Sequence, residues 1–426
     1  MSLLTDVHDR IEQAREAPGC ASELHWTSFV EFFRSRLYDP RLVTRNFLTY
    51  CDDDRNLRRT YSYAEFGTIV ERMAEMFHAK FGLTRGDRIA TVLFNHDLTA
   101  LTYFAAWTLG VAVVPINVEE TPEKKRYILE HSEASVALCW QDVYEELKAL
   151  QSMLPALREV VALGDGGILD GKETRGKSRK NSHAVGARFA PGTSRLDDPA
   201  LIIYTSGTTG PPKGVILTVA NLLIDADAIA DRHGFGLTDR LMCVLPVHHV
   251  NGIVVTLMTP FYCKGSVVLN RKFKTGSFWR RLHEEQVTSV SVVPTLLEFL
   301  LDADEDLAAY RLDRFGGVIC GAGPLLKDTA LRFEERFGFP IRHGYGLSET
   351  TCYSCFLPND LTGEEHRHWL TDFDFPSIGT ALRHNEMTIL DESGKAVAEQ
   401  ARGEICIRGR TVCAGYFKRD DANEVA

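Results

Sequence analysis

The chain has 426 residues and a formal net charge of −10 at pH 7, and 44% of its residues are hydrophobic, an ordinary share for a globular protein. This length allows a large buried core and predicts two or three subdomains. The negative charge gives no electrostatic reason to bind nucleic acid or an anionic membrane, so an anionic ligand needs a local site.

The chain carries no sign of export or of membrane insertion. Its N-terminus lacks the basic region and apolar stretch of a signal peptide. The long uncharged run 241–263 contains prolines and polar residues that are costly in hydrocarbon, so we expect no transmembrane segment and interpret this run as buried core that lines a pocket. Ten scattered cysteines, with one isolated pair at Cys352 and Cys355, favour reduced thiols over zinc or disulfides. We therefore expect a cytoplasmic protein.

Strand-like and helix-like segments alternate along the first part of the chain. Apolar runs at 88–93 and 111–115 are typical of buried strands, and residues 98–109 between them predict a helix. This alternation predicts an α/β fold of layered parallel-sheet subdomains with helices on both faces. From Pro376 onward, short alternating runs punctuated by glycine predict a smaller β-rich subdomain. The expected subdomains are, in chain order, a first α/β subdomain with an N-terminal extension over 1–195, a second α/β subdomain over 196–350 and the β-rich subdomain over 351–426.

The segment 164–196 is rich in glycine, serine and basic residues and predicts a long loop. Within it, Gly166–Lys172 satisfies the Gly-x4-Gly-Lys pattern of P-loop kinases, but Glu173 stands where a hydroxyl should bind Mg²⁺. We interpret the stretch as a loop and keep a P-loop kinase as an alternative. A basic loop could meet the phosphates of coenzyme A or an acidic carrier protein, although runs of charge are mostly solvated surface.

The most informative stretch is 204–214, Tyr-Thr-Ser-Gly-Thr-Thr-Gly-Pro-Pro-Lys-Gly. It follows the apolar run 201–204, which predicts a buried strand, so the loop leaves a sheet edge where ligands collect in open α/β folds. Glycines let backbone N–H groups approach phosphate oxygens, hydroxyls add donors, and Lys213 supplies a positive charge. The candidate phosphate-binding residues are Thr205, Ser206, Gly207, Thr208, Thr209, Gly210 and Lys213. After the loop, Thr218 is the predicted cap of a helix that ends near Gly234.

A second glycine-rich cluster is 343–350, His-Gly-Tyr-Gly-Leu-Ser-Glu-Thr, which also follows an apolar segment. Glycines on either side of Tyr345 expose the faces of its ring, and Ser348 and Glu349 suit a phosphate and a hard cation. The stretch 321–324, Gly-Ala-Gly-Pro, follows another strand-like run and is typical of a tight turn.

The eleven residues 204–214 resemble the phosphate-binding signature of the adenylate-forming (ANL) superfamily, which includes acyl-CoA synthetases, adenylation domains of peptide synthetases and luciferases. Further similar stretches extend the resemblance over nearly the whole chain from about residue 50. It implies that ATP binds here, with Tyr345 stacking on adenine, Ser348 at the α-phosphate and Glu349 as a ligand of Mg²⁺. The other residues that it implies for the nucleotide site are His343, Gly344, Gly346, Leu347, Gly321, Ala322, Gly323 and Pro324.

Residues 245–252 resemble the family motif whose histidine closes the carboxylate pocket. The matching residue is His249, whereas we interpret His248 as a core residue. The implied substrate-binding residues are His249, Asn251, Gly252 and Gly323, and the implied catalytic residues are Lys213, Glu349 and His249. Family members continue past Tyr416 into a mobile C-terminal domain with a catalytic lysine. The sequence stops at Ala426, so we expect the large N-terminal portion of a longer enzyme, poorly active without the mobile domain.

The resemblance implies an AMP-forming acid–thiol ligase that uses ATP and Mg²⁺. A carboxylic acid would become an acyl-adenylate and then pass to the thiol of CoA or of phosphopantetheine on an acyl carrier protein. Amino-acid-activating relatives place an aspartate after a phenylalanine near Phe273, but Lys274 stands here, which favours a non-amino acid of the fatty or aryl class and a role in fatty acid metabolism. The remaining alternatives are an amino-acid adenylation domain and a non-catalytic module that binds ATP or an acyl-adenylate.

Overall fold

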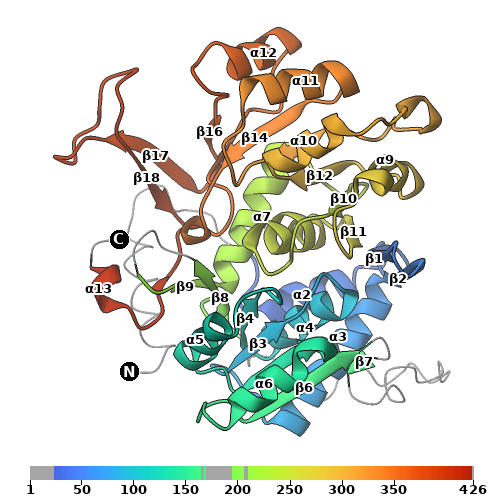
Figure 1. Ribbon diagram of the computed structural model, residues 1–426, viewed down its shortest axis with the longest axis vertical. Helices are drawn as coiled ribbons and strands as arrows, with labels where there is room; N and C mark the ends of the chain where they lie inside the picture. The colour runs from blue at the N-terminus through green and yellow to red at the C-terminus, as the bar shows by residue number, and fades with distance from the viewer. Residues whose placement is uncertain (1–23, 165–166, 169–193, 206–209, 425–426) are drawn as a thin grey trace.

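The computed structural model describes residues 24–164, 167–168, 194–205 and 210–424 of the chain. Two large sheets with helices around them form the body of the molecule, and a separate two-stranded hairpin projects beside them (Figure 1). The prediction of layered, mainly parallel sheets with a smaller β-rich part is confirmed.

The first sheet has eight strands, and its central strands are parallel. Antiparallel pairs form both of its ends. In spatial order the strands are β19 (Gly415–Tyr416), β9 (Lys213–Thr218), β8 (Pro199–Thr205), β4 (Ala112–Ile116), β3 (Arg88–Val92), β5 (Val136–Trp140), β6 (Glu159–Gly164) and β7 (Gly167–Ile168). The strands predicted at 88–93 and 111–115 are therefore confirmed as β3 and β4, and the run 201–204 lies within β8.

The second sheet has nine strands, of which the inner ones are again parallel. In spatial order they are β16 (Thr380–Ala381), β15 (Cys355–Phe356), β14 (Ile341–Tyr345), β13 (Val318–Cys320), β12 (Ser289–Val292), β10 (Arg240–Cys243), β11 (Ser266–Asn270), β1 (Asn46–Asp52) and β2 (Leu57–Ser62). Both sheets draw strands from either side of residue 195, because β1 and β2 pair in the second sheet whereas β9 and β19 pair in the first. The predicted boundaries at 195 and 350 stay predictions about folding units.

Helices cover the sheets, and α4 lies between them. Its twelve residues are all buried, since it packs against β4 of one sheet and β1 of the other. Trp107 Nε1 of α4 donates to Ala200 O at 2.8 Å, and Tyr103 Oη donates to Val247 O at 2.8 Å. The principal α-helices are α2 (Phe29–Leu37), α3 (Tyr63–Phe81), α4 (Asp97–Thr108), α5 (Pro122–Ser132), α6 (Tyr144–Gln151), α7 (Val219–His233), α8 (Thr259–Tyr262), α9 (Thr275–Glu284), α10 (Pro294–Asp302), α11 (Lys327–Phe337), α12 (Gly363–Thr371) and α13 (Asp420–Asn423).

Helix α7 fixes the segment that follows the phosphate loop. Thr218 caps its N-terminus in a reciprocal capping box with Asn221, and Gly234 ends it in the left-handed conformation, as the sequence predicted. The side chain of Asn221 also donates to Arg410 O and Val412 O, so this cap holds the C-terminal segment of the chain against the first sheet.

The run 241–263 forms β10, a buried π-helix over Asn251–Met258 and α8. The hairpin is made of β17 (Asn385–Leu390) and β18 (Glu404–Gly409), which pair with each other in a separate two-stranded sheet. Among the residues that the structure describes, no helix is both long enough and apolar enough to cross a membrane.

Candidate active site

The predicted phosphate loop joins β8 to β9, two antiparallel strands in which Thr205 lies opposite Lys213. The loop leaves β8 at its carboxyl end, and β8 is parallel to β4, so it lies at the edge where ligands bind in open sheets. Gly210 has a φ of 104°, which glycine adopts without strain. The predicted ligands Ser206, Gly207, Thr208 and Thr209 lie outside the described residues.

Tyr416 connects the two residues that the sequence singled out for phosphate and metal. Lys213 Nζ lies 4.3 Å from the centroid of the Tyr416 ring, and Tyr416 Oη donates to Glu349 Oε1 at 2.9 Å. Burial, and secondly the hydrogen bond to Glu349, raise the pKa of Tyr416, so its hydroxyl stays a donor at neutral pH. We call Lys213, Tyr416 and Glu349 the nucleotide cluster.

Backbone pairing at the end of the described chain builds this cluster. The short strand β19 pairs with β9, so that Tyr416 lies opposite Val215, and Cys413 N donates to Glu349 O at 2.7 Å. Sequence reasoning predicted Lys213 and Glu349 but not Tyr416. No local signal marks Tyr416, since its role depends on a strand pair that joins positions about two hundred residues apart.

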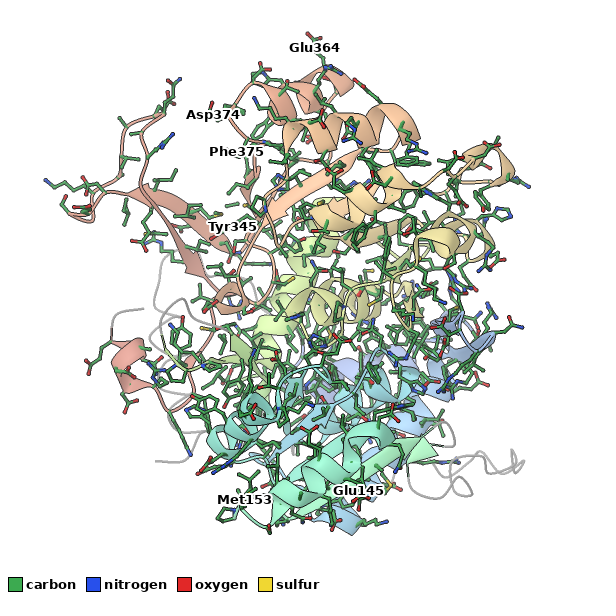
Figure 2. All side chains as sticks on the ribbon, viewed as in Figure 1. Glu145, Met153, Tyr345, Glu364, Asp374 and Phe375 are labelled. Carbon is green, nitrogen blue, oxygen red and sulfur yellow. The ribbon has the colours of Figure 1, made fainter. Side chains whose placement is uncertain are left out.

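The predicted adenine residue, Tyr345, ends β14 and is partly exposed, and burial raises the pKa of its hydroxyl. Close approach of the backbone explains both flanking glycines: a Cβ at Gly344 would lie 2.3 Å from Phe356 Cδ1, and one at Gly346 would lie 1.9 Å from Cys352 O. Figure 2 shows Tyr345 below Phe375, which is exposed. The ring therefore has the partial exposure that stacking on a base needs.

The other residues of this motif differ in their accessibility. His343 is buried, and its ring is hydrogen bonded to Ser377 O at 2.8 Å. Burial also lowers the pKa of His343. This side chain therefore stabilises the end of β14. Leu347 is exposed and Ser348 is partly exposed. The Ser348 hydroxyl thus stands beside Glu349 where a ligand could reach it.

The stretch 321–324 forms a turn after β13, as predicted. Ala322 has a φ of 58°, and a Cβ at Gly321 would lie 2.5 Å from Tyr353 Oη. Pro324 completes the turn. Gly323 has more room, because the nearest atom to a Cβ there would be Pro294 Cδ at 3.5 Å.

Asn251 lies behind this turn. Its Nδ2 donates to Tyr353 Oη at 3.2 Å and its Oδ1 accepts from the Ser291 hydroxyl at 2.7 Å, so both ends of the amide are held within the protein. Gly252, in the first turn of the π-helix, permits a close approach of the preceding backbone, since a Cβ there would lie 2.4 Å from Pro246 O. These two residues support the pocket wall.

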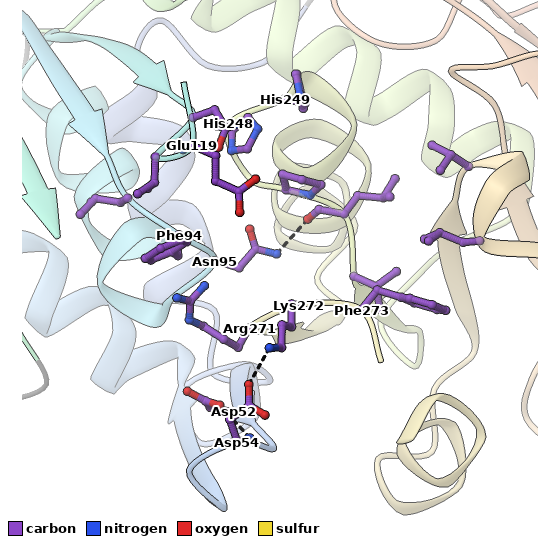
Figure 3. Close-up of a pocket in the computed structure, with 18 of the residues that line it drawn as sticks. Asp52, Asp54, Phe94, Asn95, Glu119, His248, His249, Arg271, Lys272 and Phe273 are labelled. Carbon is purple, nitrogen blue, oxygen red and sulfur yellow. Dashed lines mark hydrogen bonds and ion pairs between the residues drawn. The ribbon is translucent and has the colours of Figure 1, made fainter. Parts of the chain in front are cut away.

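A cavity of about 760 Å³ opens beside His248 and His249, between the ends of strands from both sheets (Figure 3). We call it the histidine cavity. Residues of the 241–263 run line one side, as the sequence predicted. Lining residues that sequence reasoning missed include Phe94, Asn95, Glu119 and Arg271. They belong to no recognised motif, so only the meeting of the two sheets reveals them.

Both histidines favour the neutral form. Burial lowers the pKa of His249, and burial together with its neighbour lowers that of His248 to about 3. Their ring centroids are 4.4 Å apart. His249 is exposed into the cavity, where a neutral imidazole can donate or accept a hydrogen bond. His248, which we interpreted as a core residue, is only partly buried and lines the cavity as well.

The cysteines show no metal site in the described part of the chain. Cys352 and Cys355 are buried and free, and burial raises the pKa of both thiols. Across residues 24–164, 167–168, 194–205 and 210–424, no group of three or more histidine, cysteine or acidic side chains could hold a metal ion by itself.

Known proteins resemble this chain over most of its length. A sulfoacetate–CoA ligase from Cupriavidus necator is 32% identical over 82% of the chain and 64% of its own length. A crotonobetaine/carnitine–CoA ligase from Salmonella paratyphi B is 27% identical over 85% of the chain and 68% of its own length. The ATP-bound structure of MatB from Rhodopseudomonas palustris shares the fold, with a TM-score of 0.79 and 24% identity over 93% of this chain and 73% of that one.

The chain thus spans somewhat under two thirds of the sulfoacetate–CoA ligase. Residues 44–417 match the AMP-binding enzyme family, a range that includes the phosphate loop, the tyrosine motif, the histidine cavity and Tyr416. The described fold and this match agree, and the chain belongs to the AMP-binding enzymes of the adenylate-forming superfamily.

Proposed function

We propose that the protein is an AMP-forming acid–thiol ligase that activates a non-amino carboxylic acid with ATP. The observation that carries the proposal is the nucleotide cluster, in which a lysine at the end of a phosphate loop and a carboxylate beside a tyrosine motif meet around one side chain. The names of the two related CoA ligases support an acyl-CoA product.

The chemistry requires two anions to meet. The substrate carboxylate attacks the α-phosphorus of ATP, the bond to the bridging oxygen breaks, and pyrophosphate leaves with that electron pair. Positioning and positive charge carry most of the catalysis in such a transfer. Within the described residues the Lys213 ammonium has no hydrogen-bond or ion-pair partner, so its N–H donors are available to phosphate oxygens, and the ammonium itself lies over the Tyr416 ring.

Glu349 suits a magnesium ion. One carboxylate oxygen accepts from Tyr416 and no described residue donates to the other, which leaves it as a possible ligand. Mg²⁺ commonly uses one or two carboxylates and completes its shell with phosphate oxygens and water, so the lack of a dedicated cage is compatible with this ion. When bound, Mg²⁺ would neutralise charge on the phosphates.

The acid would lie in the histidine cavity, with its reacting carboxylate at His249. A neutral imidazole can hydrogen bond to that carboxylate without reducing its nucleophilicity by a full ion pair. After adenylation, the acyl group would pass to the thiol of CoA or of phosphopantetheine on an acyl carrier protein.

The residue that follows Phe273 argues against α-amino acids. No carboxylate follows Phe273 to pair with a substrate ammonium. Lys274 stands there instead, and its Nζ is ion paired with Asp54, which also binds Lys272 at 2.8 Å. We therefore infer a fatty or aryl acid as the substrate class.

The test is exchange of labelled pyrophosphate into ATP by the full-length protein with a panel of acids. We expect exchange that depends on added fatty or aryl acids and on Mg²⁺, and none with α-amino acids. Exchange with α-amino acids alone would make the protein an amino-acid adenylation domain. Tight ATP binding without any exchange would make it a non-catalytic binding module.

A further inference from the structure

Arg271 lines the histidine cavity, and no residue that the structure describes accepts a hydrogen bond from its side chain. It follows β11, where its backbone N donates to Cys51 O at 2.8 Å, and its guanidinium lies 3.7 Å from the centroid of the Phe94 ring. No carboxylate among the described residues lies within ion-pair distance of this guanidinium, and no described side chain or carbonyl accepts from it. An arginine stays charged, so a half-buried fork of N–H donors is left without acceptors.

The basic residues near Arg271 in the chain differ from it, because they are paired with carboxylates. Lys272 and Lys274 are paired with Asp54, and Arg281 Nη2 donates to Asp53 at 2.6 Å. Acidic partners are thus present for these three basic residues that follow Arg271 in the chain. Burial lowers the pKa of Arg271, whereas tyrosine and aspartate charges around it act in the opposite direction.

The carboxylates that line the cavity do not compensate Arg271 by direct contact. Asp52 attracts it through space but stays beyond ion-pair distance and accepts from Asp54 N at 3.0 Å. Glu119 lies beside His248, toward the other end of the cavity (Figure 3).

His249 and Arg271 lie toward opposite ends of the cavity in Figure 3. Much of the cavity lining is apolar, with Leu93, Phe94, Val118, Leu245 and Phe273 among its residues, and Asn95 is a polar member of it. A molecule that fits this arrangement has an acidic group at each end and an apolar body in the middle.

We propose that Arg271 selects carboxylic acids with a second anionic group, a carboxylate or a sulfonate, at the end remote from the reacting carboxylate. The planar guanidinium can bind such a group through two parallel N–H···O bonds. The cation–π contact with Phe94 favours the observed position of the guanidinium. The inference rests on the proposed function, because it assumes that the reacting carboxylate lies at His249. It narrows the substrate to doubly acidic members of the fatty and aryl acids.

The test compares matched acids in the exchange reaction, which needs no thiol. The pairs are succinate with butyrate, adipate with hexanoate, terephthalate with 4-methylbenzoate, and 3-sulfopropionate with propionate. We expect at least one doubly acidic acid to exceed its partner in kcat/KM about 10-fold or more. Arg271→Gln should reduce that preference about 10- to 100-fold, mainly through KM, and leave the monoacids nearly unchanged. Arg271→Lys should restore part of it.

Arg280→Gln is the matched control, since it removes an arginine that lies outside the cavity lining and is paired with Asp53 and Glu284, and it should keep the preference. Thermal denaturation checks that the variants are folded. Equal loss for both members of a pair in Arg271→Gln, or an effect confined to the thioester-forming step, would overturn the inference and leave the proposed function standing.

If no acid supports exchange, the proposed function fails, and calorimetry then decides the inference. Succinate and adipate should bind the wild type more tightly than Arg271→Gln, whereas equal affinity would overturn it.

Discussion

The nucleotide cluster and the histidine cavity are built in different ways. The cluster unites side chains from three motifs or strand pairs, and each is tied to a loop, a turn or a backbone ladder. The cavity is lined by side chains at the ends of strands, where the backbone constrains position but leaves residue type open. We infer that the cluster provides chemistry shared across the family, whereas the cavity decides which acid this protein accepts. Substitutions in the cluster should then affect all acids alike, and those in the cavity should depend on the acid.

The largest effect is expected for Lys213→Met. The change removes the positive charge at the exit of the phosphate loop but keeps a stem that can lie over Tyr416. Pyrophosphate exchange in the full-length protein should fall about 10³-fold with every acid, as for the loss of a principal electrostatic contributor. Lys395→Met serves as the control, because Lys395 is exposed in the connection between β17 and β18. A loss that differed strongly between acids would contradict the division between cluster and cavity.

Glu349→Gln should come next. It keeps the hydrogen-bond acceptor for Tyr416 but removes the charge that suits a hard cation, so exchange should fall about 10²-fold or more. The deficit should be greatest at limiting Mg²⁺ and partly recover as Mg²⁺ is raised. Near-normal exchange at limiting Mg²⁺ would remove Glu349 from the metal site.

Substitutions of Tyr416 test its two contacts, with Lys213 and with Glu349, one at a time. Tyr416→Phe keeps a ring beneath Lys213 and loses only the hydrogen bond to Glu349, so we expect about a 10-fold loss. Tyr416→Leu also loses the cation–π contact and should lose several times more. Steady-state exchange with both variants measures the difference. If the two variants behave alike, the ring face does not position Lys213.

The smallest effect concerns the stability of the cavity wall. The pKa of His248 is lowered to about 3 by burial, below its ordinary value near 6.5. The unfolded chain therefore binds a proton more readily than the folded one between these values, so folding is most favoured above about pH 6.5 and loses free energy as the pH falls toward 3. His248→Gln should reduce the acid-induced loss in the free energy of unfolding by about 1 kcal/mol at pH 5, a figure that allows for the partial exposure of the side chain. Urea denaturation at pH 7 and pH 5 measures it. A variant with unchanged acid sensitivity would show that His248 is not the titrating group.

Sequence patterns predicted the local parts of this molecule well. Strands β3, β4 and β8 and helix α7 with its two caps follow from apolar runs and capping residues, which act over a few positions. The pairing of β1 and β2 with the second sheet could not be predicted in this way, because register and partner are properties of distant segments. The predicted subdomain boundary at 195 stays a prediction about folding units.

The same division holds for the site. Lys213, Tyr345 and Glu349 lie in stretches whose glycines and hydroxyls suggest their chemistry. Tyr416 and Arg271 carry no such signal. The position of Tyr416 depends on the pairing of β19 with β9. The proposed role of Arg271 depends on its having no acceptor among the described residues of a cavity formed by both sheets. A lone arginine in a sequence gives no sign that its charge is unpaired.

The two-residue strand β19 has a consequence for the dynamics of the site. Its ladder with β9 joins Gly415 to Ile216 and Tyr416 to Val215, and backbone hydrogen bonds from Ala414 N to Ile216 O and from Phe417 N to Gly214 O flank it. Opening so short a ladder breaks few backbone hydrogen bonds, so the nucleotide cluster can come apart through local fraying while both sheets remain intact. Amide hydrogens of 215–216 and 415–417 should then exchange with solvent through local opening, without unfolding of the sheets. ATP, by binding Lys213, should slow this exchange more than it slows amide exchange in α4.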